Sequence, residues 1–429
     1  MKTQQSPFKG GAVLYGQSGG TTRVINSSGW GVIEQALNHP DVGPVLWAEN
    51  GIKGILSGRL FDMRKEDPEE LKLLLQTPGA AFGSCRKKLS SEEQLAQVID
   101  VLKKYNVRYF FYNGGNDSMD TCNKVHEYAQ KVGYEMRVMG IPKTIDNDLA
   151  GTDHTPGYGS VAKYIATTRR DLEKGYSGVY GEGEPITVVE TMGRNAGWIA
   201  AASALGAERE SVENVPHHIY LPEVPFDVDK FIQNTIELQK KSRVAIAYVS
   251  EGVQDEEGKY IFERAHKADR DEFGHVKTGG LATFLADELR KHTKTRVKSV
   301  ELGPLQLCQG SIASQADITE AYNAGKIAFE SAMKGMSGKM VAFKCTREPN
   351  YKCEYVTVPL SVVANEEQKI PLEWIDTDNN YVTDECIDYM RPLIQGNPKI
   401  ECCENGLQKY PKLKKIGFAL PSSARETAE

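Results

Sequence analysis

Short apolar runs alternate with amphipathic stretches through the chain. In the first half, the apolar runs that predict strands are 12–16 (AVLYG), 44–49 (PVLWAE), 107–112 (VRYFFY) and 136–141 (MRVMGI). Further strands are expected at 186–190 (ITVVE), 243–250 (RVAIAYVS) and 339–345 (KMVAFKC). Helices are expected at 22–37, 118–131, 196–205 and 317–333. Strands that alternate with helices predict an α/β fold with a parallel sheet covered on both faces.

One predicted helix shows its periodicity clearly. Leu95, Val98, Ile99 and Leu102 recur at i, i+3, i+4 and i+7, which is the spacing of a helix with one buried face. Ser90 followed by Glu93 has the pattern of a capping box at its start.

Glycine-rich and charged loops follow five of the predicted strands. They are 17–20 (QSGG), 113–118 (NGGNDS), 142–148 (PKTIDND), 191–197 (TMGRNAG) and 251–252 (EG). Because the carboxyl ends of parallel strands meet at one edge of a sheet, we expect these loops to form a ligand site there.

The loop PKTIDND carries the residues of most interest. Phosphoryl transfer needs a carboxylate to accept a proton from the attacking hydroxyl and a cation beside the transferring group. Asp146, Lys143 and Arg194 supply these groups if their loops meet. The alternatives are a polar turn capped by Asp and Asn, and a surface arginine paired with an acidic side chain.

The remaining motifs are less specific. The double glycines of QSGG and NGGNDS allow close approach to a phosphate, but they are also ordinary turn residues. A hydrogen-bonded structural role is favoured over catalysis for His154, and a solvated helix face over a ligand site for Arg169 and Arg170.

Composition limits the classes of partner. The chain has 429 residues, 40% of them hydrophobic and 26% charged, so two lobes of ordinary size are expected. The net charge of −6 does not favour nucleic acid or an anionic membrane as partner.

With no transmembrane-length apolar run and no apolar N-terminal segment, the expected location is the cytoplasm. The eight cysteines include no C-x-x-C pair and are expected to be reduced thiols, neither a disulfide framework nor a zinc site.

Taken together, these motifs resemble the phosphofructokinase family, and its pyrophosphate-dependent branch most closely. The resemblance extends from about residue 11 to at least residue 345. It rests on SGGTTRVIN, GGNDSMDT, PKTIDNDL, DHTPGYGSVAKYIA, ETMGRNAGWIAAASAL, SEG and ADRDEFGH. It implies two Rossmann-like lobes with parallel-rich sheets, an active site between them and a homo-oligomer, either a dimer or a tetramer. The implied division is 1–155 with about 305–350 as the donor-binding lobe, about 156–304 with about 351–405 as the sugar-phosphate lobe, and 406–429 as a tail.

The resemblance also implies roles for individual residues. Asp146 is the expected base, with Lys143, Arg194 and Asp117 completing the catalytic set. Expected donor-binding residues are Gly19, Gly20, Arg86 and Gly115. Expected sugar-phosphate ligands are Thr144, Asp146, Met192, Gly193, Arg194, Glu251 and Arg296, the last contributed across a subunit boundary. Asn116 stands where the family has a magnesium-associated aspartate, so Mg²⁺ is the expected cofactor.

Two positions bear on the choice of phosphate donor. Members that use ATP generally have glycine in place of Asp117 and of Lys143. A carboxylate at Asp117 would lie near the α-phosphate of ATP, whereas Lys143 offers a cation to the compact pyrophosphate. The resemblance therefore implies reversible phosphoryl transfer from pyrophosphate to the 1-hydroxyl of fructose 6-phosphate, a step of glycolysis.

Three departures from the family pattern keep other substrates open. Leu307 replaces an arginine that grips the sugar 6-phosphate, Pro304 replaces a histidine or tyrosine, and Asn116 replaces an aspartate. One alternative is an enzyme that uses ATP or another sugar phosphate. A second alternative is a regulatory subunit without efficient catalysis, against which the intact PKTIDND and MGRNAG motifs count.

Overall fold

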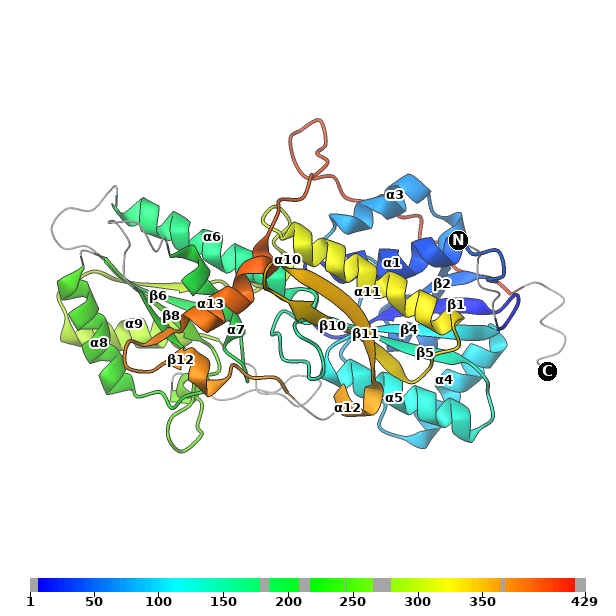
Figure 1. The fold of residues 1–429 in the computed structure, drawn as a ribbon, viewed down its shortest axis with the longest axis horizontal. Coiled ribbons are helices and arrows are strands. Elements are labelled where there is room, and N and C mark those ends of the chain that lie inside the picture. The colour runs from blue at the N-terminus through cyan, green and yellow to red at the C-terminus, as the bar shows by residue number, and fades with distance from the viewer. Residues whose placement is uncertain are drawn as a thin grey trace.

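The computed structural model describes residues 7–177, 185–207, 217–242, 244–264, 279–363 and 367–420. These residues form two lobes that lie side by side along the longest axis of the molecule, each built around its own sheet (Figure 1). The motif ADRDEFGH lies outside the described residues.

The first lobe contains a seven-stranded sheet in the order β11-β10-β5-β4-β1-β2-β3. The run from β10 to β2 is parallel, and the edge strands β3 and β11 are antiparallel to their neighbours. All predicted strands of this lobe are confirmed, whereas both antiparallel edge strands were missed. The strands are β1 (Ala12–Gln17), β2 (Val45–Ala48), β3 (Leu60–Asp62), β4 (Val107–Gly114), β5 (Arg137–Pro142), β10 (Lys339–Thr346) and β11 (Lys352–Pro359).

Helices cover both faces of this sheet, as the alternation predicted. Strand β4 divides its aromatic side chains accordingly: Phe110 and Tyr112 join one buried cluster, and Tyr109 and Phe111 join the other. Helices α4 and α5 pack with the first cluster, and α1 and α11 with the second. The helices of this lobe are α1 (Ile25–Leu37), α2 (Ile52–Leu56), α3 (Pro68–Lys72), α4 (Glu92–Lys104), α5 (Asn116–Lys131), α11 (Gln315–Met333) and α12 (Leu360–Val363).

The start of α4 differs by one residue from the prediction. Ser91, not Ser90, is the N-cap, and its hydroxyl accepts a hydrogen bond from the Gln94 amide nitrogen at 3.4 Å. The side chain of Gln94 in turn accepts from the Ser90 amide nitrogen at 2.9 Å. Two adjacent serines made the register ambiguous in the sequence.

The second lobe contains four parallel strands in the order β7-β8-β6-β9. Its strands are β6 (Ile186–Thr191), β7 (His217–Tyr220), β8 (Ala245–Ser250) and β9 (Val297–Glu301), with a small antiparallel pair of β12 (Ile375–Asp376) and β13 (Tyr381–Val382). Its helices are α6 (Tyr158–Ser177), α7 (Trp198–Ala201), α8 (Val228–Lys241), α9 (Leu281–His292), α10 (Leu305–Cys308) and α13 (Asp384–Met390). Helix α7 is shorter than predicted because the chain continues as a 3-10 helix over Ala202–Gly206.

The boundary between the lobes differs from the expected division. Residues 351–405 were expected in the second lobe, but β11 pairs with β10 along its whole length, from Lys339↔Pro359 to Thr346↔Lys352. The expected tail also packs on the first lobe, where the Phe418 amide donates to the Leu60 carbonyl at 2.8 Å. Residues 352–363 and 413–418 therefore belong to the first lobe.

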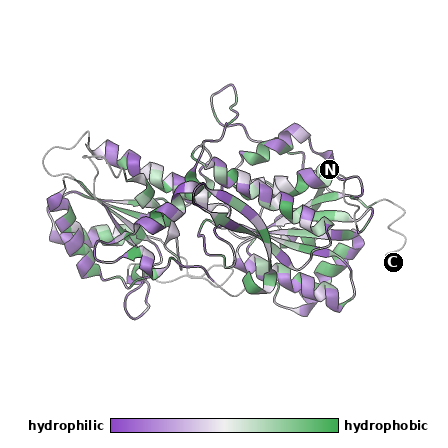
Figure 2. Ribbon diagram, in the orientation of Figure 1, coloured by the Kyte–Doolittle hydropathy of each residue, from purple (hydrophilic) through white to green (hydrophobic). Residues whose placement is uncertain are grey.

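Hydropathy follows this architecture. The strands at the centre of both lobes are mainly hydrophobic, whereas the helices also carry many hydrophilic residues (Figure 2). Across the part of the chain that the structure describes, no helix combines the length and apolar character needed to cross a bilayer.

Candidate active site

A cavity of about 600 Å³ lies where the five predicted loops meet. The loops after β1, β4 and β5 line it from the first lobe, and those after β6 and β8 line it from the second. The predicted site residues in its lining are Gly19, Gly20, Arg86, Gly115, Asn116, Asp117, Lys143, Thr144, Asp146, Met192, Arg194 and Glu251. Gly193 lies between two lining residues and accepts a hydrogen bond from the Ser250 hydroxyl at 2.6 Å.

The loop after β5, which carries Asp146, is held by several hydrogen bonds. The Asp146 amide donates to Thr144 Oγ1 at 3.1 Å, and the same hydroxyl lies 3.3 Å from Asp146 Oδ2. Asn147 adopts a left-handed backbone conformation with φ 57°, which asparagine tolerates better than most residues. Its buried side chain bridges the Thr155 amide and the Tyr389 hydroxyl at 3.0 and 2.8 Å. The loop is therefore fixed by hydrogen bonds on the side away from the cavity.

Burial makes Asp146 more basic than an ordinary aspartate. Loss of solvent raises its pKa, while the hydrogen bond from Thr144 and the charges of Lys143, Arg194 and Arg86 hold the rise back. A carboxylate with a raised pKa is suited to accept a proton.

Asp148 also lines the cavity. Burial is the main cause of its raised pKa, and the negative charges of Asp146 and Glu367 add to it.

Lys143 connects two of the loops that line the cavity. Its Nζ donates a hydrogen bond to the carbonyl oxygen of Gly20, in the loop after β1. Burial lowers its pKa to about 8, although the charge of Asp146 opposes this effect.

The backbone at Gly19 and Gly20 lies beside two cationic side chains. A Cβ atom on Gly19 would lie 3.4 Å from Lys143 Nζ, and one on Gly20 would lie 3.4 Å from Arg86 Nη2. Gly19 also has φ +77°, which favours glycine. The two glycines therefore keep the backbone close to two cations.

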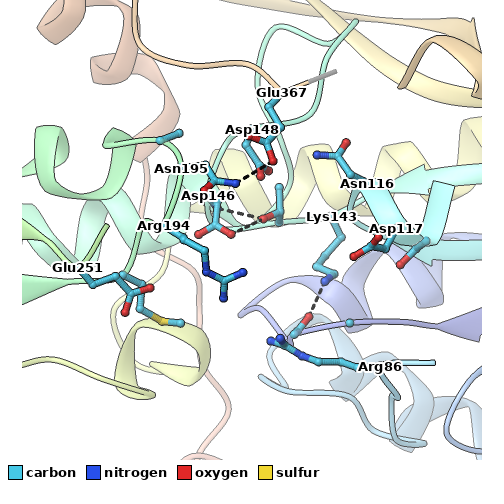
Figure 3. A pocket seen from close by; sticks show the side chains of 17 residues that line it. Arg86, Asn116, Asp117, Lys143, Asp146, Asp148, Arg194, Asn195, Glu251 and Glu367 are labelled. Atoms are coloured by element: carbon cyan, nitrogen blue, oxygen red, sulfur yellow. Dashed lines mark hydrogen bonds between the residues drawn. The ribbon is translucent and has the colours of Figure 1, made fainter. Parts of the chain in front are cut away.

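Arg194 enters the cavity from the second lobe, opposite Lys143, and both side chains point into it (Figure 3). It follows Gly193, whose φ of +132° is open to glycine and strained for other residues. Among the described residues, the buried Nε of Arg194 has no hydrogen-bond partner. A guanidinium group that points into a polar cavity is suited to bind a phosphate oxygen.

The N-terminus of α5 closes the other end of the cavity. Asn116 and Asp117 occupy its first turn, and Asp117 Oδ1 lies 2.9 Å from Lys88 Nζ. The amide oxygen Oδ1 of Asn116 is buried and has no hydrogen-bond partner within the described chain. An anionic side chain at a helix N-terminus occupies the position that would otherwise favour a phosphate.

Several lining residues were not predicted. Asp148, Ser118 and Asn195 lie within quoted motifs and could have been found by counting every polar residue of each loop. Ala196 also lies within a quoted motif, but it is apolar and carries no such signal. Glu367 carries no local signal in the sequence. It reaches the cavity because the Gln368 amide donates to the Asp148 carbonyl at 2.8 Å, and its carboxylate accepts from Asn195 at 2.9 Å.

Arg296 does not line the cavity of its own chain. It is exposed and immediately precedes β9, and its carbonyl oxygen accepts from the Ile186 amide at 2.9 Å. That is the amino end of the strands, opposite the edge where the site lies. Arg296 can therefore act at this kind of site only from a neighbouring copy of the chain.

The segment that departs from the family pattern lies at the border of the site. Leu307 packs against the hydrophobic core of the second lobe instead of lining the cavity. The neighbouring Gln306 is buried, and its Oε1 accepts from the Met192 amide at 3.0 Å. This segment therefore supports the position of Met192 and contributes no charge at Leu307.

The structure tests the interpretations of His154 and Arg169, which both lie outside the cavity. His154 is buried between Asp153 and Glu320, so the structural interpretation is confirmed. Arg169 was expected on a solvated face, but it is fully buried, with Glu173 at 2.6 Å and a hydrogen bond to the Gly206 carbonyl. The sequence pattern did not predict this burial, because its two partners are apparent only in the folded structure. In the sequence, Arg169 is one of several polar residues of α6.

Comparison with known proteins identifies the family. Residues 12–332 match the family described as Phosphofructokinase, which is well over half of the chain. The chain belongs to the phosphofructokinase family. Among its relatives, the pyrophosphate--fructose 6-phosphate 1-phosphotransferase of Halomonas elongata is 40% identical over 407 residues, which cover 94% of this chain and 96% of that protein. The protein of the same name from Methylococcus capsulatus is 42% identical over 389 residues, covering 89% and 91%.

Other phosphofructokinase relatives extend the comparison. The pyrophosphate-dependent phosphofructokinase from Nitrosospira multiformis superposes with a TM-score of 0.87 at 35% identity, covering 96% of this chain and 98% of that one. A sulfofructose kinase from Alkalicoccus urumqiensis is 31% identical over 375 residues, covering 85% and 94%. The two-lobed phosphofructokinase fold predicted from the sequence is therefore confirmed, and the pyrophosphate-dependent branch is the right one.

Proposed function

We propose that this protein transfers phosphate reversibly from pyrophosphate to the 1-hydroxyl of fructose 6-phosphate, giving fructose 1,6-bisphosphate. The observation that carries the proposal is the position of Lys143. Lys143 and Asp146 both follow β5, with Lys143 three residues closer to the end of the strand. The ammonium group of Lys143 donates a hydrogen bond to the Gly20 carbonyl oxygen, on the proposed donor side. One strand end thus presents a cation to the donor and a carboxylate to the acceptor.

The reaction follows from these positions. The oxygen of the sugar 1-hydroxyl attacks the nearer phosphorus of pyrophosphate, and Asp146 accepts the proton of this hydroxyl. The bond from that phosphorus to the bridging oxygen breaks, and inorganic phosphate leaves. Lys143 and Arg194 stabilise the negative charge on the transferring phosphoryl group from opposite lobes.

Asp117 selects the donor by excluding ATP. The carboxylate lies in the first turn of α5. The resemblance to ATP-using members implies that a longer donor would bring its α-phosphate close to this side chain. Two like charges about 4 Å apart at an effective dielectric of about 20 repel by roughly 4 kcal/mol, which is about three decades of discrimination. Pyrophosphate has no α-phosphate and is short enough to avoid the carboxylate of Asp117.

We assign the divalent metal to the same end. Asn116 Oδ1, buried without a partner in the described chain, and the carboxylate of Asp148 are the oxygen ligands that a hard cation such as Mg²⁺ accepts. When bound, Mg²⁺ would neutralise part of the charge of pyrophosphate. With one amide and one carboxylate from the protein, much of its coordination would come from the donor and water.

A second candidate function changes the acceptor. Leu307 offers no charge where the family commonly grips a 6-phosphate, and a relative is named sulfofructose kinase. Losing such a charge-assisted contact costs about 1.5 to 3 kcal/mol of binding unless another cation substitutes. Assays of fructose 6-phosphate, its sulfonate analogue and other sugar phosphates with pyrophosphate decide between the two functions. Fructose 6-phosphate is expected to give the highest kcat/KM.

We also propose a cytoplasmic location and a homo-oligomer, and Arg296 supplies the structural reason for the oligomer. An exposed arginine on the far side of its own sheet serves a site only in an adjacent copy. A purely regulatory role is disfavoured because the base, both cations and the anchoring hydrogen bonds of the base loop are all present.

The substitution Asp146→Asn tests the proposed chemistry. It keeps the shape of the side chain but removes proton acceptance, so kcat is expected to fall by about 10² to 10⁴. Asp120→Asn is the matched control, since Asp120 lies on α5 and pairs with Lys124 at 2.6 Å. Fructose 6-phosphate should still bind to Asp146→Asn in calorimetry. Turnover near that of the unmodified enzyme would refute the role of Asp146.

A further inference from the structure

A second cluster of reactive side chains lies behind the base loop, outside the cavity. At its centre, His154 Nε2 lies 2.7 Å from Glu320 Oε2 and His154 Nδ1 lies 3.0 Å from Asp153 Oδ1. The Sγ atom of Cys345 lies 3.8 Å from the same Nδ1. The buried imidazole of His154 is therefore surrounded by one thiol and two carboxylates.

A second thiol lies directly beside the first. Cys345 on β10 and Cys353 on β11 are directly opposed cross-strand partners in the antiparallel register. Directly opposed residues of antiparallel strands have Cα atoms about 4.5 to 5.5 Å apart, which lies within the range that a disulfide spans. Both side chains are half-buried, and β11 is an edge strand of the sheet.

The surroundings favour a thiolate at Cys345. The hydrogen bond from Cys353 is the largest cause of a pKa lowered to about 6, burial opposes it, and His154 lowers the pKa further. For His154 itself, burial favours the neutral form, but the charge of Glu320 and hydrogen bonds to Asp153 and Cys345 outweigh it and raise the pKa. The Cys353 thiol has a raised pKa, chiefly because it shares its hydrogen bond with Cys345. The two thiols are therefore chemically unequal.

A metal ion is a poorer occupant of this cluster, although Asp153, His154 and Cys345 have ligand atoms within 4.8 Å of one another. Arg347 holds both carboxylate oxygens of Asp153 at 2.8 and 2.9 Å, so a cation would have to displace a guanidinium. The Cys345 thiol also lies 3.6 Å from the Tyr351 hydroxyl, which donates to Glu320 Oε1 at 2.7 Å. The network is complete without a metal.

We propose that Cys345 and Cys353 form a reversible, peroxide-sensitive thiol pair in which Cys345 reacts first and Cys353 resolves it. The Cys345 thiolate attacks one oxygen of hydrogen peroxide, the O–O bond breaks, and hydroxide leaves as water after taking a proton. The resulting sulfenic acid is attacked by the Cys353 sulfur, which gives up its proton. A disulfide forms and a second water leaves. Two thiols are oxidised and one peroxide is reduced to two waters.

Oxidation at this pair would reach the active-site loop. Asp153 and His154 belong to the segment between β5 and α6 that also carries Asp146. That segment is tied to β10 by hydrogen bonds from the Asp153 amide to the Phe343 carbonyl and from the Phe343 amide to Thr152 Oγ1, both at 2.9 Å. Removing the negative thiolate beside His154 changes the charge balance of the loop that positions the base.

Peptide mapping of the full-length enzyme tests the pair. The reduced protein is treated with hydrogen peroxide, alkylated and digested with trypsin without reductant. Trypsin cuts after Lys344, Arg347 and Lys352, so the disulfide would link peptide 345–347 to peptide 353–369. We expect this linked pair, two hydrogens lighter than the sum of its parts, to form before the exposed Cys308, Cys402 or Cys403 is oxidised. Dithiothreitol should abolish it.

Two serine variants separate the roles of the thiols. Cys353→Ser should leave a sulfenic acid on Cys345 that dimedone labels, whereas Cys345→Ser should leave Cys353 at least about tenfold less labelled because it lacks the activating histidine. Cys308→Ser is the matched control and should not alter the linked peptide. Oxidation of the exposed cysteines with residues 345 and 353 still reduced would overturn the proposal, as would equal labelling of the two serine variants.

Discussion

The ammonium group of Lys143 donates a hydrogen bond to the carbonyl oxygen of Gly20, so the loops after β5 and β1 are joined inside the cavity. The same lysine is three residues before Asp146, whose carboxylate is anchored to Thr144. In the proposed reaction, donor contact and proton acceptance are therefore set by one short segment. Changes at Lys143 should alter the donor step, and changes at Asp146 the acceptor step.

Replacing Asp117 and Lys143 together by glycine should change the donor. Removing the carboxylate at the start of α5 lifts the repulsion of an α-phosphate, and removing the lysine takes away the cation that favours pyrophosphate. The kcat/KM with pyrophosphate should fall and that with ATP should rise, so their ratio changes by about three decades or more. Steady-state assays with both donors measure this ratio. An unchanged donor preference would show that neither side chain selects the donor.

The affinity for pyrophosphate should weaken above pH 8. Burial lowers the pKa of Lys143 to about 8, so the side chain is protonated below that pH and loses its charge above it. The KM for pyrophosphate should therefore rise between pH 7 and pH 9.5. In Lys143→Arg the guanidinium stays charged over this pH range. The ionisation of pyrophosphate itself affects both enzymes equally, and once this effect is subtracted, the KM of the variant should not change with pH. Parallel profiles for the two enzymes would contradict this account.

Lys143 should also reduce the stability of the unliganded protein. Its pKa in the folded state lies below that of an unfolded lysine, so the protonated form costs free energy on folding at pH values below about 8. This cost fades as the pH rises toward about 10.4. Lys143→Met should raise the free energy of unfolding by about 1 to 3 kcal/mol at pH 7 and by little at pH 10.5.

The control for this measurement is Lys124→Met, which removes an exposed ion pair with Asp120. It should change the stability by less than about 0.5 kcal/mol. Urea denaturation of the three proteins at both pH values gives the comparison. A loss of stability in Lys143→Met at pH 7 would show that the hydrogen bond to Gly20 outweighs the cost of burial.

Arg296 should act across a subunit boundary. Arg296→Ala and Asp146→Asn should each be poorly active alone, because in the proposed oligomer every site needs Arg296 from one copy and Asp146 from the other. Coexpressed as a mixed dimer population, they should recover about a quarter of the normal activity, since half of the dimers contain one intact site of two. Activity equal to the average of the two separate variants would mean that Arg296 does not serve a neighbouring site.

Much of the fold was predictable because its core strands are parallel and apolar. β1, β4, β5, β6 and β8 each read as an apolar run followed by a glycine or a charged loop, and sheet geometry then brings those loops together. The antiparallel edge strand β11 was missed because it alternates exposed and half-buried residues and follows a short turn from β10. Its assignment to the wrong lobe followed from that omission.

The site divides in the same way. Asp146, Lys143 and Arg194 were found because they lie in short charged loops directly after strands. Glu367 was missed because only a long-range contact with the segment at Asp148 brings it to the cavity. The burial of Arg169 was also hidden, since pairing with Glu173 and Gly206 is a property of the packed lobe.

The central claim is that this cavity uses pyrophosphate. A coupled assay of the purified enzyme with fructose 6-phosphate and Mg²⁺ compares kcat/KM for pyrophosphate with that for ATP under the same conditions. The repulsion at Asp117 and the cation at Lys143 predict a ratio of about 10³ or more in favour of pyrophosphate. A ratio near one, or a preference for ATP, would contradict the account.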